Sequence, residues 1–137
     1  MKVGGRERPD YGVAMADDAG HRPERDDYYH ALAFTAARRA IFRGRLVGAI
    51  HVKGDRVIAT GYNGTPEGLP NCLDGGCLRC GDRDAFEPGT AYDLCLCVHA
   101  EANALLTAGR FGASTDGTSV YTTDQPCFSC SKELIQA

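Results

Sequence analysis

The chain has 137 residues, of which 43% are hydrophobic and 24% charged, and its formal net charge is −3. These values are typical of one globular domain with its own core, and they argue against a protein that wraps a long nucleic acid. No apolar run reaches the roughly 20 residues that a membrane-spanning helix needs, and the first ten residues, MKVGGRERPD, lack the apolar segment of a signal peptide. We therefore expect a cytoplasmic protein with no membrane partner.

Residues 1–25 are polar and charged and contain several glycines and prolines. This composition predicts a flexible N-terminal arm, with an oligomer contact as the alternative. The folded domain is expected over residues 26–137. Its first helix is predicted over residues 27–42, where alanines and larger apolar residues follow a helical stripe, and Gly44 is expected to stop it.

Arginines are concentrated at the end of this predicted helix. They are Arg38, Arg39, Arg43 and Arg45. Two interpretations stay open. The positive charge complements the C-terminus of a helix, or it recognises a phosphate, for which the guanidinium fork is well shaped.

Three short segments predict β-strands. Residues 46–52 and 56–62 form two strand-like runs, and the Gly54-Asp55 turn between them predicts a hairpin. A β-branched run over residues 118–123 predicts a third strand. The loop after the hairpin contains Asn63, whose amide either contacts a ligand or forms a simple Asn-Gly turn.

Five of the seven cysteines lie within residues 72–97, which we name the cysteine insert. They are Cys72, Cys77, Cys80, Cys95 and Cys97. So long a loop without a regular pattern needs an internal staple. An odd number of cysteines and the lack of an export signal argue against disulfides. Four of these thiols fit a closed structural zinc site, and the alternative is reduced cysteines packed as small apolar groups.

The other two cysteines belong to the strongest motif in the chain. It consists of His99-Ala100-Glu101 followed by Pro126-Cys127-Phe128-Ser129-Cys130. One imidazole and two thiols suit zinc, and three protein ligands leave the fourth tetrahedral position open for water. Glu101 is not needed as a ligand, so it is a candidate for carrying protons. A non-enzymatic zinc module is the alternative, and a structural zinc site has no use for this glutamate.

Both parts of the motif are expected at helix starts. Residues 98–108 are rich in alanine and leucine and predict a helix with His99 in its first turn. Pro126 favours the opening of a second helix, on which Cys127 and Cys130 share one face. Because a helix N-terminus favours the thiolate form of cysteine, two facing helix starts are expected to hold one zinc ion.

The H-x-E and P-C-x-x-C strings are the signature of zinc-dependent deaminases. Together with Gly61-Tyr62-Asn63-Gly64-Thr65-Pro66 and the extended string H-A-E-A-N-A, they make residues 27–137 resemble the deoxycytidylate (dCMP) deaminases of the cytidine deaminase-like superfamily. The resemblance implies a three-layer α/β/α sandwich with a central mixed sheet. Members of that family continue beyond the position of Ala137, so we expect a chain that is either truncated at its C-terminus or unusually short.

The resemblance also implies a reaction. A hydrolase of this family deaminates dCMP to dUMP and ammonia, in pyrimidine deoxynucleotide metabolism. His99, Cys127 and Cys130 are then the ligands of one catalytic zinc, which activates water for attack on C4 of cytosine. Glu101 carries the protons. Free cytidine and the adenosine of tRNA are alternative substrates of related deaminases, and the lack of a basic surface argues against tRNA.

Further residues and partners follow from the same resemblance. The backbone N–H of Ala100 is expected to bind the base carbonyl, and Asn63 is expected to line the nucleotide pocket. Arg39 matches the arginine of an Arg-Ser pair that precedes V-G-A in the family, although Ala40 replaces the serine. Relatives are typically homo-oligomers, and some carry a second, structural zinc near the cysteine insert.

Overall fold

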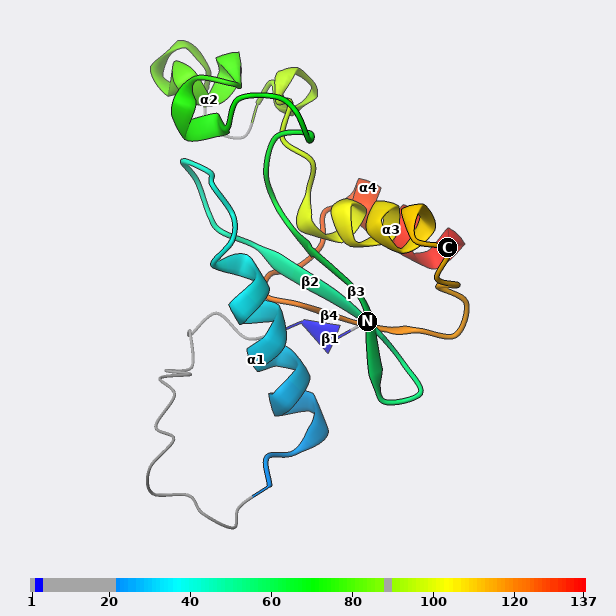
Figure 1. Cartoon of the computed structure of the whole chain (residues 1–137). Coiled ribbons are helices and arrows are strands. Elements are labelled where there is room, and N and C mark those ends of the chain that lie inside the picture. Colours follow the sequence, from blue (N-terminus) through cyan, green and yellow to red (C-terminus); the bar gives the residue numbers. More distant parts are fainter. Residues whose placement is uncertain (1, 4–21, 88–89) are drawn as a thin grey trace.

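The computed structural model describes residues 2–3, 22–87 and 90–137 (Figure 1). Its strands and helices, in chain order, are β1 (Lys2–Val3), α1 (Arg25–Ala37), β2 (Gly48–Lys53), β3 (Arg56–Tyr62), α2 (Leu78–Gly81), α3 (Ala100–Arg110), β4 (Ser119–Thr122) and α4 (Phe128–Gln136). Single 3-10 turns cover Cys72–Asp74, Arg83–Ala85 and Tyr92–Leu94. Most of the predicted N-terminal arm lies outside the described residues.

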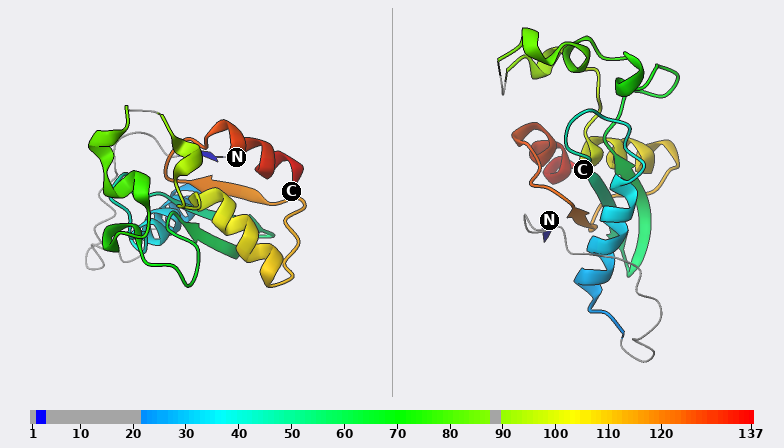
Figure 2. Two further views of the ribbon diagram at one scale, coloured as in Figure 1. Left: turned by 90° about the horizontal axis from the view of Figure 1, so that it is seen from above. Right: turned by 90° about the vertical axis from the view of Figure 1, so that its left-hand side faces the viewer.

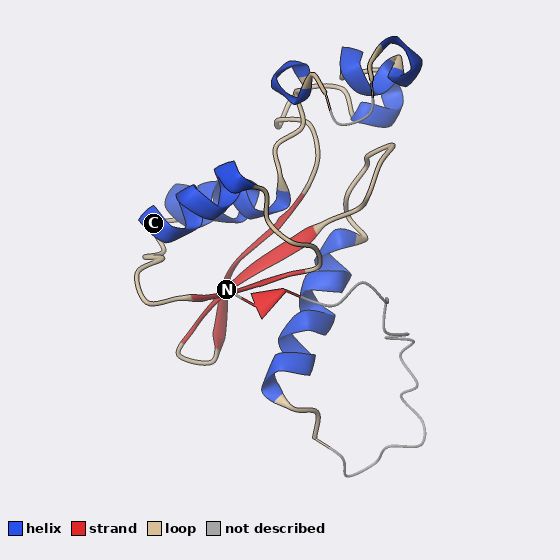
Figure 3. Cartoon of the chain, turned by 180° about the vertical axis from the view of Figure 1, so that it is seen from behind, coloured by secondary structure: helices blue, strands red, loops and turns tan. Residues whose placement is uncertain are grey.

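The strands form one mixed sheet in the order β1-β4-β2-β3, seen in red in Figure 3. β2 pairs antiparallel with both β3 and β4, and β1 runs parallel to β4. All three predicted strands are present, within two residues of their expected bounds. The turn at Gly54 and Asp55 is also confirmed, because both residues have positive φ (53° and 58°), as a two-residue hairpin turn of type I′ requires.

Helices cover both faces of the sheet (Figure 2). On one face, Tyr29 and Ala33 of α1 pack against Ile50 and Val52 of β2. On the other, Ala100 and Ala104 of α3 pack against Ala49 of β2, and α4 lies beside α3. Neighbouring residues of a strand point to opposite faces, so β2 joins the two cores. The three-layer α/β/α sandwich is confirmed.

Two glycines allow the helices to approach the sheet closely. A Cβ atom at Gly48 would overlap the backbone of α1 at Ala33 and Ala37. A Cβ atom at Gly61 would overlap the backbone of α3 at Ala100 and Ala104. Gly61 therefore sets the distance between β3 and the first turn of α3.

The first helix ends earlier than predicted, at Ala37 rather than just before Gly44. Ala40 is buried, whereas Ile41 remains 42% exposed, so the apolar residues beyond Ala37 do not continue one helical face. Phe42 instead packs against the buried cysteines of the insert. Packing of this tertiary contact outweighs the helical propensity of the segment. Within the described residues, no helix is long and apolar enough to cross a bilayer.

Candidate active site

The predicted ligands come together at two helix starts. His99 is the N-cap residue of α3, and Cys127 is the N-cap residue of α4. The Nδ1 atom of His99 lies 3.5 Å from the Sγ atoms of both Cys127 and Cys130. We name these three residues the ligand cluster. Zinc bonds of about 2.1 Å to nitrogen and 2.3 Å to sulfur at a tetrahedral angle put such atoms about 3.6 Å apart. The cluster therefore fits zinc.

Both cysteines of the ligand cluster lie at the start of α4. The backbone N–H of Cys130 donates to Sγ of Cys127 at 3.5 Å, so this sulfur is held against the first turn of the helix. Burial raises the pKa of the Cys130 thiol to about 12, and the Glu101 carboxylate adds to this rise. A bound divalent cation acts in the opposite direction and deprotonates such a thiol. Cys130 would therefore become a thiolate ligand through the binding of such a cation.

Glu101 lies in the first turn of α3 and is only 4% exposed. Burial raises the pKa of its carboxyl group above the usual range. The carboxyl group is close enough to the Cys130 thiol for each to influence the pKa of the other. An acidic group beside the ligand cluster is therefore present, as the sequence predicts.

Backbone contacts hold the first turn of α3 against the neighbouring loop. Gly64 and Val98 form an antiparallel bridge, with N···O distances of 3.2 and 2.8 Å. The side-chain amide of Asn103 donates to the carbonyl of Tyr62 at 2.9 Å. These bonds join the end of β3 to both sides of His99. The role of Asn103 was not predicted, because its partner is 41 positions away.

Asn63 has a structural task as well as its predicted place in the pocket. Its Oδ1 atom accepts from the N–H of Val47 at 2.8 Å, and its Nδ2 atom donates to the carbonyl of Arg45 at 2.9 Å. The side chain is buried and lines the cavity described next. It therefore fixes the segment before β2 as one wall of that cavity.

The ligand cluster opens into a cavity of about 730 Å³, which we name the active-site cavity. The volume is within the range of small-molecule sites. Its walls come from the segment before β2, the cysteine insert, the start of α3 and the segment before α4. The lining residues are Phe42, Gly44, Arg45, Val47, Asn63, Arg79, Asp84, Phe86, Glu87, Cys95, Cys97, His99, Ala100, Glu101, Asp124, Gln125 and Cys127.

Predicted site residues are distributed unevenly around this cavity. Ala100 and Glu101 line it, whereas Arg39 lies outside its lining. Arg45, one of the four arginines noted after the first predicted helix, forms an ion pair of 2.6 Å with Asp124, a lining residue that the sequence did not single out. Because 79 positions separate the two residues, no local sequence pattern predicts this ion pair. The insert also adds lining residues that no periodicity predicted.

The cysteine insert holds a second group of potential ligands. Cys77, Cys80, Cys95 and Cys97 place their Sγ atoms within 4.8 Å of one another, and we name them the thiol cluster. Two of the separations, from Cys95 to Cys77 and to Cys80, are 3.7 and 3.8 Å. Four sulfurs around a tetrahedral zinc lie about 3.8 Å apart. The buried Cys72 packs beside this cluster.

Comparisons with known proteins agree with this geometry. The chain is 47% identical over 115 residues to a deoxycytidylate deaminase of Schizosaccharomyces pombe, covering 84% of this chain and 35% of that protein. It is 40% identical to the deoxycytidylate deaminase of Mycobacterium phage D29, covering 85% of this chain and 89% of that one. The chain spans about a third of the length of the yeast relatives that it matches.

A solved structure shares the fold. The dCMP deaminase from the cyanophage S-TIM5, in complex with dCMP and dUMP, superposes with a TM-score of 0.65 at 32% identity, covering 85% of this chain and 76% of that one. The model of one protein family, the cytidine and deoxycytidylate deaminase zinc-binding region, matches residues 23–137. With a zinc-compatible cluster beside a buried glutamate in the matched region, this chain belongs to the cytidine and deoxycytidylate deaminase family.

Proposed function

We propose that the chain catalyses the hydrolytic deamination of dCMP to dUMP and ammonia. The observation that carries this proposal is the buried carboxyl group of Glu101 beside a three-ligand cluster, both opening into one nucleotide-sized cavity. The names of the relatives and the nucleotides bound to the cyanophage structure support dCMP as the substrate.

His99, Cys127 and Cys130 hold the catalytic zinc in this proposal. When bound, zinc lowers the pKa of water and so provides a nucleophile at neutral pH. The carboxylate oxygen of Glu101 accepts a proton from the attacking water and donates it to N3 of cytosine. The same oxygen then takes the remaining proton from the new hydroxyl group on C4 and passes it to the leaving amine. The C4–N4 bond breaks as the C4 carbonyl forms, and the amine departs as ammonia. A buried acid suits this task, because it exchanges protons with the substrate rather than with solvent.

Three further residues are proposed to contact the substrate. The N–H of Ala100 points from the first turn of a helix, where donors have no intrahelical partner, and it is proposed to bind the base carbonyl. Asn63 uses one N–H and one oxygen lone pair for the backbone, and the rest of its amide is proposed to contact the sugar. Arg39 stays a prediction for phosphate binding, although it does not line the cavity.

We also propose that the thiol cluster binds a second, structural zinc. The sulfur separations support this, and so does the location of the cluster, because Cys95 and Cys97 belong to the cavity wall. A metal there would stiffen a segment whose described residues form only short helical turns.

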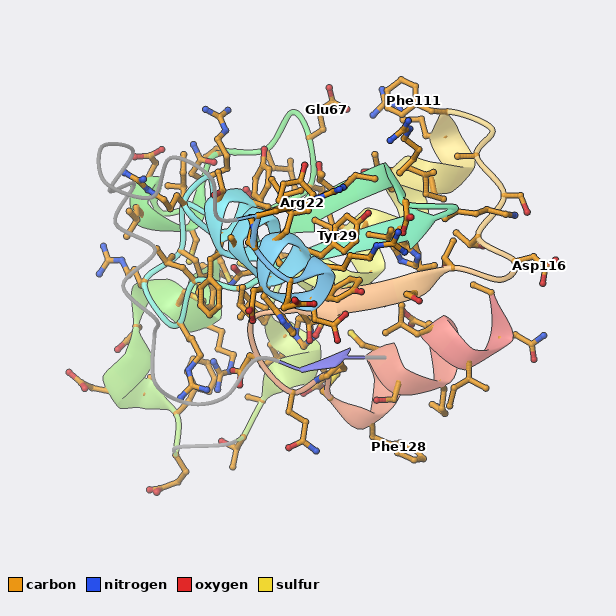
Figure 4. All side chains as sticks on the ribbon, turned by 90° about the horizontal axis from the view of Figure 1, so that it is seen from below. Arg22, Tyr29, Glu67, Phe111, Asp116 and Phe128 are labelled. Carbon is orange, nitrogen blue, oxygen red and sulfur yellow. The ribbon has the colours of Figure 1, made fainter. Side chains whose placement is uncertain are left out.

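We also propose that the protein is a homo-oligomer, that it is cytoplasmic, and that it acts in pyrimidine deoxynucleotide metabolism. Phe128 and Ile135 of α4 are 80% and 87% exposed, and large apolar side chains exposed in this way favour an interface. Figure 4 shows Phe128 projecting away from the body of the protein, whereas Tyr29 lies between α1 and the sheet.

Ammonia release from dCMP, deoxycytidine and a tRNA substrate tests the reaction. The zinc-loaded chain is expected to release ammonia from dCMP, with dUMP formed in equal amount. Turnover of deoxycytidine or tRNA with no turnover of dCMP would assign the site to another deaminase. If the chain binds zinc stoichiometrically but turns over none of the three substrates, it is a zinc-binding module rather than an enzyme.

A further inference from the structure

The segment between β4 and α4 carries Cys127 of the ligand cluster, and two contacts tie this segment to the start of β2 and the residues before it. The first contact is made by Thr123, directly after β4. Its backbone N–H donates to the carbonyl of Gly48, and its hydroxyl accepts from the N–H of Gly48, both at 3.0 Å. The second contact is the 2.6 Å ion pair between Asp124 and Arg45. We name these two contacts the clasp.

The hydroxyl of Thr123 takes the place of a backbone group of the sheet. Ala49 and Thr122 are opposite one another at the end of the β2–β4 ladder, so Gly48 and Thr123 are the next opposed residues. In a regular antiparallel sheet such a pair exchanges two N–H···O=C bonds. Here the side-chain oxygen of Thr123 accepts one of them. The main chain can therefore turn away toward Cys127 while it remains bound to β2.

The partners of the clasp on the β2 side are themselves held in place. A Cβ atom at Gly48 would overlap the backbone of α1 at Ala33 and Ala37, so the start of β2 has little room to move toward that helix. The carbonyl of Arg45 accepts from Nδ2 of the buried Asn63 at 2.9 Å. The clasp thus connects the segment before α4 to a fixed part of the sheet.

Short-range contacts extend this fixed position to Cys127. The hydroxyl of the buried Thr122 donates to the carbonyl of Asp124 at 2.7 Å. One carboxylate oxygen of Asp124 accepts from the N–H of Gln125 at 3.0 Å, and the other belongs to the ion pair. The ring of Pro126 then restricts φ. The chain therefore has little conformational freedom between the clasp and the metal ligand.

We infer that Thr123 and Asp124 are positioning residues, which set the location of Cys127 relative to His99. The inference rests on the proposed function, in which Cys127 and His99 hold the catalytic zinc. Contacts that orient metal ligands typically contribute about 10–100-fold to metal affinity or activity. Without the clasp, Sγ of Cys127 would sample positions away from its 3.5 Å separation from Nδ1 of His99. The ligand cluster would then bind zinc more weakly.

Removal of the Thr123 hydroxyl tests this role. Thr123→Val keeps the shape of the side chain, and it is expected to lower kcat for dCMP about tenfold while KM stays within about twofold. Transfer of one zinc ion per chain to a chromophoric chelator is expected to become about tenfold faster. Thr123→Ser keeps the hydroxyl and should bring both values to within about threefold of the wild type. The thiol cluster is the same in every variant, so its contribution cancels in the comparison.

The matched control is Thr118→Val. Thr118 lies just before β4, where its hydroxyl is 3.0 Å from Nδ1 of His51 on β2. Thr118→Val and Thr123→Val therefore remove hydrogen bonds at opposite ends of the same strand pair, and only Thr123 adjoins the ligand-bearing segment. The control should lower the free energy of unfolding but leave kcat and zinc transfer within about twofold.

Asp124→Asn tests the second contact of the clasp and carries the test if Thr123→Val does not fold. It keeps the shape of the side chain and removes its charge. The Arg45 side chain is 71% exposed, so the ion pair contributes less than the Thr123 contact, and zinc transfer is expected to become about threefold faster.

The inference is wrong if Thr118→Val accelerates zinc transfer as much as Thr123→Val does, since the hydroxyl then serves only overall stability. It is also wrong if Thr123→Ser recovers nothing, or if zinc transfer stays at the wild-type rate in both Thr123→Val and Asp124→Asn. If the wild type binds zinc but deaminates no substrate, the proposed function fails, and the zinc-transfer rates alone decide whether the clasp positions Cys127.

Discussion

The amide of Asn103 reaches across from α3 and donates to the carbonyl of Tyr62 at the end of β3, at 2.9 Å. This bond lies one helical turn beyond His99, so it fixes the angle at which the first turn of α3 leaves the sheet. Loss of a half-buried hydrogen bond typically costs about 1 kcal/mol. Asn103→Ala is therefore expected to lower the free energy of unfolding by about 1 kcal/mol in urea denaturation.

The same substitution is expected to lower kcat for dCMP roughly tenfold, because small shifts of a catalytic group are costly. Zinc content should stay unchanged, since the bond does not involve a ligand. A variant with normal stability and normal kcat would show that this hydrogen bond has no role in positioning the helix.

Replacement of Glu101 by Gln tests the proton carrier directly. The substitution keeps the shape of the side chain and removes its basic oxygen, so zinc should remain bound. Turnover of dCMP is expected to fall by about 10³-fold, within the usual range for general acid–base groups. Metal analysis on the same preparation separates loss of chemistry from loss of metal. Turnover close to that of the wild type, with zinc present, would contradict the assigned role.

Gly61 offers a test of the close approach between β3 and α3. An added methyl group at this position overlaps the backbone of Ala100 and Ala104, so Gly61→Ala is expected to destabilise the fold by about 1–3 kcal/mol. The matched control is Gly109→Ala on α3, where a Cβ atom meets nothing within 4 Å. Helix propensity predicts that the control stabilises the protein by about 0.5–1 kcal/mol. Equal effects of the two substitutions would show that the contact is not tight.

Zinc stoichiometry tests the thiol cluster. Inductively coupled plasma analysis is expected to find two zinc ions per wild-type chain and one per Cys77→Ser/Cys80→Ser chain. Cys72→Ser is the control, because Cys72 is buried beside the thiol cluster but is not one of its four members. It should retain both ions. A content of one zinc per wild-type chain would contradict the second zinc site. The thiol cluster would then consist of reduced cysteines packed against one another.

The pH dependence of stability is expected to involve His51 of β2. This residue is 1% exposed, and burial lowers the pKa of its imidazole below the usual 6.5. Its Nδ1 atom lies 3.0 Å from the hydroxyl of Thr118, and its Nε2 atom has no hydrogen-bond partner among the described residues. The unfolded chain therefore binds a proton more readily than the folded chain does, so stability should fall as pH drops below about 6.5.

His51→Gln should remove this contribution. The stability difference between wild type and variant is expected to narrow by up to about 1.4 kcal/mol per pH unit on the acidic side, in parallel urea titrations between pH 5 and 8. Protonation of metal ligands affects both proteins and cancels in the difference. A difference that stays constant over this range would mean that His51 does not titrate during unfolding.

Local patterns predicted those parts of the molecule that local forces determine. Short strand-like runs, one of them rich in β-branched residues, predicted the strands, and the Gly54-Asp55 turn predicted the hairpin. The ligands at the two helix starts were also predicted, because the spacing of the motif has a chemical meaning by itself. Their roles as zinc ligands and proton carrier stay predictions for the experiments above.

Contacts between distant segments were beyond the reach of such patterns. The end of α1 at Ala37 depends on Phe42 packing against the cysteine insert, and no propensity scale contains that contact. Asn103 belongs to the H-A-E-A-N-A string, but the string does not indicate its partner. That partner becomes apparent only once the fold brings Asn103 to the carbonyl of Tyr62.

The cavity lies where two differently stabilised parts of the chain meet. One part is a sheet with helices on both faces, and the other is the cysteine insert, in which the buried Cys72, Cys77 and Cys80 pack together. Amino-acid changes in the insert can therefore reshape this wall of the cavity while the ligand cluster at the helix starts keeps its geometry. Selection for a new substrate can therefore act on the insert without changing the residues of the ligand cluster.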